Sequence, residues 1–76
     1  MIVGDLVKYT NAYCESVKAH TFYSNLHNLD GVALVKEIAV SSSGYYYALV
    51  EWVGIPDPVT GGLWITSETL SNLEVL

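Results

Sequence analysis

The sequence predicts a single small all-β domain, and three observations carry that prediction. The chain has 76 residues, a length that suits one domain. Hydrophobic residues make up 51% of it and charged residues only 14%, a composition that argues against disorder. The apolar residues fall in five short runs rich in β-branched and aromatic side chains, separated by Gly, Pro, Asn and Ser clusters typical of turns.

The first predicted strand covers residues 1–10 and contains a bend or bulge at Gly4. The segment 11–28 follows, and its apolar positions fit no period of two. The spacing of Tyr13 and Val17 allows a short helix. We nevertheless interpret this segment mainly as a long structured loop.

The second and third strands form a predicted hairpin. They cover residues 32–40 and 45–53, and the Ser-Ser-Ser-Gly segment 41–44 is a hairpin loop of ordinary length. The segment 55–61 contains two prolines, which are incompatible with a central strand. We therefore place the fourth strand after it, at residues 62–66.

The C-terminal part predicts one helical or 3₁₀ turn at residues 67–72, capped by Thr66 or Ser67, and a last strand at 73–76. Five short strands, a long loop at 10–31 and a helical turn before the last strand are the order of an SH3-like barrel. Such a barrel places the first and last strands close together and removes exposed sheet edges. A flat three-stranded meander is the alternative.

Several short motifs support the same fold. They are the opening run Val3–Tyr9, the strand start Gly31-Val32, the strand end Val50–Trp52 with Gly54, the second tryptophan Trp64, and the ending Leu73–Leu76. Together they resemble small uncharacterised SH3-like proteins encoded by tailed bacteriophages, including phages of cyanobacteria. The long loop 10–31 and the proline-containing loop 54–62 depart from that pattern. The resemblance implies an SH3-like fold, a phage origin and no catalytic residues.

The charge balance argues against two classes of partner. The chain has three Lys+Arg, all lysine, against eight carboxylates, for a net charge of −5. Nucleic-acid binding normally needs clustered Lys and Arg to neutralise phosphates, and anionic membranes attract similar clusters. We expect neither partner, although bases of a single strand can also stack on aromatic side chains.

The sequence favours a reducing compartment. Cys14 is the only cysteine, so no internal disulfide forms. No signal peptide is visible at the start of the chain. The longest uncharged stretch, residues 38–50, is shorter than the ~20 apolar residues of a spanning helix. We expect an intracellular protein or a component of a virion.

The strand 45–53 is apolar on both faces. Alternation puts Tyr46, Ala48, Val50 and Trp52 on one face and Tyr45, Tyr47, Leu49, Glu51 and Val53 on the other. Only one face of a small barrel can point inward, and the sequence does not decide which. Two covers for the second face remain open: the loop 11–28, with its Phe22, Tyr23 and Leu26, or a protein partner, including a second copy of the chain.

The predicted function is therefore protein interaction or self-association in a homo-oligomer, without enzymatic activity or a cofactor. The residues expected to contact the partner are Tyr45, Tyr47, Leu49, Tyr9 and Trp64. The alternative is a ligand-recognition module that binds a modified peptide or single-stranded nucleic acid. In its sharpest version, an aromatic cage of Tyr9, Tyr45, Tyr47 and Trp64, with Glu51, holds a methylated lysine by cation–π attraction.

Metal binding and catalysis have weaker signals. Cys14, His20, His27 and Asp30 lack the close ligand pairs of structural zinc sites. The pair of Cys14 and His20 is no more than any chain with one cysteine and two histidines offers. We also expect a barrel this thin to leave little room for a pocket of ~300 Å³ or more.

Overall fold

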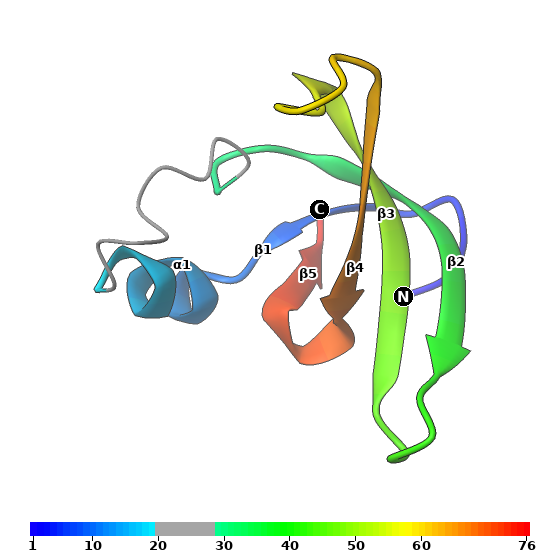
Figure 1. Cartoon of the computed structure of the whole chain (residues 1–76). Helices are drawn as coiled ribbons and strands as arrows, with labels where there is room; N and C mark the ends of the chain where they lie inside the picture. The colour runs from blue at the N-terminus through cyan, green and yellow to red at the C-terminus, as the bar shows by residue number, and fades with distance from the viewer. Residues whose placement is uncertain (20–28) are drawn as a thin grey trace.

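A computed structural model of the chain describes residues 1–19 and 29–76. In these residues, five antiparallel strands form one sheet, accompanied by one α-helix and one 3₁₀ turn (Figure 1). The elements are β1 Leu6–Tyr9, α1 Asn11–Lys18, β2 Ala33–Val40, β3 Tyr46–Pro56, β4 Leu63–Thr69, η2 Leu70–Asn72 and β5 Leu73–Val75. The predicted all-β class is confirmed, as is a 3₁₀ turn before the last strand.

The strand order is β4-β3-β2-β1-β5, and the sheet is not closed by hydrogen bonds between β4 and β5. The first strand lies between β2 and the last strand: Val7 is opposite Ala33 on one side and Val75 on the other. The expected proximity of the first and last strands is therefore confirmed, whereas complete closure of the sheet is not.

The first strand is shorter than predicted because a turn precedes it. Gly4 has a φ of +94°, and the N–H of Asp5 donates to the carbonyl of Ile2 at 3.1 Å. The predicted bend is confirmed. The regular ladder with β2 begins at Leu6, and before it the N–H of Gly4 donates to the carbonyl of Val35 and the N–H of Val35 donates to the carbonyl of Asp5, both at 2.9 Å. A side chain at position 4 would be strained, since this backbone conformation favours glycine.

The two middle strands and the 3₁₀ turn also differ from the predicted bounds. β3 extends to Pro56 and β4 to Thr69, so both strands of this hairpin are longer than expected. Thr69 is the N-cap of η2, and its side chain makes no capping hydrogen bond. The predicted caps Thr66 and Ser67 are wrong, because both residues lie within β4.

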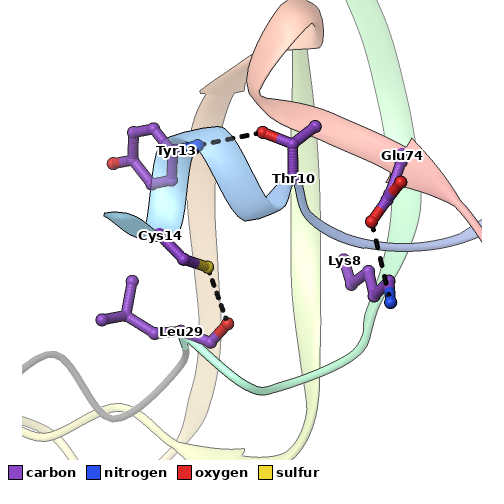
Figure 2. Close-up of polar contacts among 6 residues, drawn as sticks. All are labelled: Lys8, Thr10, Tyr13, Cys14, Leu29 and Glu74. Carbon is purple, nitrogen blue, oxygen red and sulfur yellow. Dashed lines mark hydrogen bonds and ion pairs between the residues drawn. The ribbon is translucent and has the colours of Figure 1, made fainter. Parts of the chain in front are cut away.

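Residues 11–18 form a helix, so the interpretation of this part as loop is wrong. The Oγ1 of Thr10 accepts a hydrogen bond from the N–H of Tyr13 at 3.1 Å, which caps α1 (Figure 2). Val17 is buried, and Tyr13 and Cys14 pack against the core. The Sγ of Cys14 also donates to the carbonyl of Leu29 at 3.4 Å, which ties the helix to the segment before β2.

Side-chain burial shows which face of β3 points inward. Ala48, Val50 and Trp52 are at most 2% exposed, so the face that they share is the inner face. They pack with Val7, Tyr9, Ala33, Val35 and Leu73 of the neighbouring strands and with Val17 and Leu29. Tyr45, Tyr47, Leu49, Glu51 and Val53 belong to the opposite, outer face.

Candidate functional site

The outer face of the sheet carries a row of side chains that crosses β1, β2, β3 and β4, and all but one of them are apolar. Leu6 is opposite Leu34, Leu34 opposite Glu51, and Glu51 opposite Ile65. The N–H of Leu76 donates to the carbonyl of Leu6 at 3.0 Å, which adds a fifth member on the β5 side. We name this row, Leu76, Leu6, Leu34, Glu51 and Ile65, the outer stripe.

The outer stripe is open to solvent over much of its length. Leu6, Ile65 and Leu76 are 46%, 50% and 61% exposed, and Leu34 and Glu51 are half-buried. Residues next to the stripe members along β1, β2 and β3 are buried in the core. Because side chains alternate between the two faces of a sheet, the stripe members point to the outer face. Exposed apolar side chains gathered on one face are typical of a contact surface.

A β-bulge in β2 places a lysine side chain beside the outer stripe. Val35 is opposite Val50, whereas Glu37 is opposite Leu49, so Lys36 is the extra residue of β2. Its Nζ lies 3.9 Å from Oε1 of Glu51, which neutralises the carboxylate in the stripe. A second ion pair joins Lys8 and Glu74 at 3.6 Å on β1 and β5 (Figure 2). Both lysine side chains are about half exposed, so the pairs contribute little to stability.

Three of the five predicted contact residues belong to the outer face. Tyr45 is 69% exposed, and Tyr47 and Leu49 are half-buried. Leu49 lies on the same strand as Glu51, two residues along, so it is next to the stripe. The described part of the loop that was expected to cover this face, α1, packs against the core instead. Phe22, Tyr23 and Leu26 lie outside the described residues.

The other two predicted contact residues, Tyr9 and Trp64, lie toward the interior. Tyr9 is 4% exposed and belongs to the core, and Trp64 is half-buried and packs against it. The ring of Tyr9 lies 4.6 Å from that of Tyr13 and 4.9 Å from that of Trp52. The five predicted residues therefore do not share one surface, and neither do the members of the predicted aromatic cage.

A chain of hydrogen bonds crosses the interior from β1 to β4. The hydroxyl of Tyr9 donates to the two carboxylate oxygens of Glu68, at 2.7 and 2.9 Å. Nε1 of Trp52 donates to Oγ1 of Thr66 at 2.9 Å, and that hydroxyl lies 3.5 Å from Oε2 of Glu68. Desolvation by burial raises the pKa of Glu68, and the hydrogen bonds from Tyr9 and Thr66 oppose that rise. These contacts bring β1 and β4 together although no backbone ladder joins them.

Two open grooves lie at the ends of the β3–β4 hairpin, so the expectation of little room for a pocket is wrong. The larger, of about 460 Å³, is lined by Trp52, Gly54, Ile55, Pro56, Gly61, Gly62 and Leu63. The smaller, of about 350 Å³, is lined by Gly44, Tyr45, Tyr46, Thr69, Leu70 and Ser71. Neither lining contains a carboxylate, imidazole, thiol or amine.

The metal and membrane hypotheses are addressed only in part. Among residues 1–19 and 29–76, no three His, Cys, Asp or Glu side chains gather into a cation site. His20 and His27 lie outside the described residues, so the set with Cys14 and Asp30 remains a hypothesis. Over the same ranges, the structure holds no helix with the length and apolar character that crossing a membrane requires.

Sequence reasoning missed the outer stripe because its members come from four different strands and the residue after β5. Alternation gives the face of each residue within a strand, but only the register brings Leu6, Leu34 and Ile65 into one row. One signal was present: the triplet Leu-Val-Lys occurs at 6–8 and at 34–36. Its two leucines are direct partners across β1 and β2.

Comparisons with known proteins return no match for this chain: no family model, no curated protein and no solved structure. A function is therefore argued from the geometry of the sheet.

Proposed function

We propose that this protein is a non-enzymatic interaction module that contacts a protein partner, or a second copy of itself, through the outer face of its sheet. The observation that carries the proposal is the outer stripe, a row in which four apolar side chains and Glu51 lie side by side on the outer face, three of the apolar ones exposed. Tyr47 and Leu49 extend this surface along β3. Tyrosine is enriched at the energetic centres of interfaces.

The fold in this proposal is an SH3-like barrel. Three features support it: the strand order β4-β3-β2-β1-β5, the 3₁₀ turn between β4 and β5, and the contact of Tyr9 with Glu68 across the interior. This contact curls β4 toward β1 without a backbone ladder between the sheet edges. A phage origin is proposed on the sequence resemblance alone.

The proposal that the protein is not an enzyme rests on what the described residues bring together. Burial raises the pKa of Glu68, and its carboxylate bonds to Tyr9 in the interior rather than at the wall of a groove. The grooves are lined by apolar, glycine and hydroxyl side chains. Acid–base or nucleophilic chemistry normally needs titratable groups at the wall of a pocket.

Ligand recognition is the second candidate function, and one observation favours it. Tyr45 and Tyr46 are 69% and 59% exposed, and both line the smaller groove. Such rings can stack on bases or surround a cationic head group. Intrinsic fluorescence titrated with oligonucleotides and with methyl-lysine peptides tests this function. A saturable change that disappears with Tyr46→Ala supports ligand recognition, and no change with either ligand rejects it.

The test of the interaction surface is the double variant Tyr47→Ala with Leu49→Ala. If the outer face is the contact, we expect self-association to weaken by about 1 kcal/mol or more, roughly fivefold in Kd. Sedimentation equilibrium over a dilution series measures that change. Unfolding by urea of each variant checks that the fold is retained.

The matched control is Val40→Ala with Tyr46→Ala. These two residues are paired across β2 and β3, are 53% and 59% exposed, and lie on the other side of the sheet. The control removes one aliphatic and one tyrosine side chain as well, so it should leave the association constant unchanged. Equal weakening by both double variants, or by neither, would contradict the assignment of the contact to the outer face.

A further inference from the structure

The strand β4 is a free edge of the sheet. It pairs with β3 on one side, and within residues 1–19 and 29–76 no backbone hydrogen bond joins its seven residues to any other strand. Figure 1 shows this strand running beside β3 for most of its length. An unpaired strand edge of this length is a template for another β-strand.

The register identifies which backbone groups point to the free edge. The N–H of Val53 donates to the carbonyl of Val32, so Val53 directs its backbone groups toward β2. Glu51 and Leu49 are in phase with Val53 and do the same, because backbone direction alternates along a strand. Their partners on β4, Ile65 and Ser67, form the non-hydrogen-bonded pairs of that ladder and direct their N–H and C=O groups away from β3.

This edge lacks the features that normally prevent strand addition. β4 contains no lysine, arginine or proline, the residues that commonly block such edges. Its single charged residue, Glu68, has its carboxylate bonded to Tyr9 in the interior. The opposite edge, β5, has three residues and carries exposed Glu74, which pairs with Lys8. Strand addition is therefore favoured at β4 over β5.

We propose that β4 pairs antiparallel with β4 of a second copy of this chain, about a two-fold axis at Thr66. This register uses the full length of both strands and places Ile65 opposite Ser67 of the second copy, where their outward N–H and C=O groups meet. Glu68 faces Trp64 of the second copy, so the two carboxylates are not opposed. The chain carries a net charge of −5, and the one carboxylate of β4 is bonded to Tyr9 in the interior, so two copies approach with little repulsion at this edge.

The pairing also joins the two outer stripes. Ile65 is the end of the stripe on β4 and is 50% exposed. In the proposed dimer it lies opposite Ser67 of the second copy, so the two stripes lie on the same face of the joined sheet, offset by two residues along β4. A ladder between two edge strands buries less area than a standard interface, so the association is weak and concentration-dependent.

The test is the variant Ser67→Pro, compared with Ser67→Ala and the unmodified protein by native mass spectrometry over a dilution series. Proline removes the outward N–H and places its ring at the edge, while the ladder from β4 to β3 does not use that group. Alanine keeps the N–H and removes only the exposed hydroxyl. We expect a dimer of the unmodified protein and of Ser67→Ala, and at least a tenfold weaker dimer of Ser67→Pro.

A second variant, Ile65→Lys, covers the case in which Ser67→Pro does not fold. A lysine on an edge strand opposes pairing by charge and leaves the backbone intact, so this variant should also be monomeric. An unmodified protein that stays monomeric overturns the inference, and so does a folded Ser67→Pro or Ile65→Lys variant that still forms the dimer. Ile65 also belongs to the outer stripe, so Ser67→Pro and the Tyr47 and Leu49 double variant separate the two proposals. The double variant keeps the outward backbone groups of β4 and should still form the β4 dimer.

Discussion

The folded structure raises the pKa of the Glu68 carboxyl group. Its carboxylate accepts two hydrogen bonds from the Tyr9 hydroxyl, and burial nevertheless raises its pKa. The charged form is thus less favourable in the folded protein than in the unfolded chain. The same residue links β1 to β4, so a group that supports the curvature of the sheet also makes stability depend on pH.

The variant Glu68→Gln tests that pH dependence. In the unmodified protein, the unfolded chain loses this proton near the ordinary Glu pKa of ~4.3, and the folded protein loses it at a higher pH. Glu68 therefore makes its full contribution to the free energy of unfolding below a pH of ~4.3. That contribution falls as the pH rises through the pKa that Glu68 has in the folded protein. Gln does not titrate, so the stability of this variant relative to the unmodified protein should rise with pH.

Urea unfolding at a series of pH values measures the difference between the two proteins. Glu37→Gln is the matched control, because it removes the same charge at an exposed position on β2. Its difference from the unmodified protein should lack the rise. A constant difference for Glu68→Gln across the series would show that the position of Glu68 does not govern the pH dependence.

At the scale of elements, α1 is held by its N-terminal cap and by its contacts with the core and with Leu29. It has eight residues, and a helix this short is marginal alone. Thr10 caps its first turn, and Val17 packs into the core. The stability of α1 therefore depends more on such tertiary and capping contacts than on the helix propensity of its residues.

Thr10→Ala should lower the free energy of unfolding by about 1 kcal/mol, because the N–H of Tyr13 loses its partner. Thr69→Ala is the matched control: Thr69 is also an N-cap, but its side chain makes no capping hydrogen bond. We expect that variant to stay within about 0.5 kcal/mol of the unmodified protein. Equal losses from the two variants in urea unfolding would contradict the role of the Thr10 cap.

The elements also show what the sequence could predict. The presence of five strands could be predicted because β-branched and aromatic runs favour strands. The bend at Gly4 could be predicted because it depends on one local residue. The extension of β3 to Pro56 was not predictable, because proline is tolerated where its missing N–H is not needed by the ladder. The faces of β3 followed from alternation, but which face is inner depended on packing with Val7 and Val35 from other strands. The outer stripe depended in the same way on register between strands.

At the scale of the whole molecule, the net charge of −5 opposes contact between copies. Neither the outer stripe nor the β4 edge offers an ion pair between copies that salt would weaken. Self-association should therefore become tighter as salt is raised from ~20 to ~150 mM, because screening reduces the repulsion. Sedimentation equilibrium in the two buffers measures this change. Weaker association at higher salt would indicate a contact based on opposite charges.

The position of β1 between β2 and β5 has a consequence for the order in which the protein acquires its structure. Val7, near the start of the chain, is opposite Val75, near its end. Such distant pairing is slow, because a long loop must close before any contact compensates for the lost entropy. During synthesis the β2–β3–β4 meander can form while β1 still lacks its second neighbour. The first strand is fully paired only after β5 has been synthesised, so folding of the sheet is completed only then.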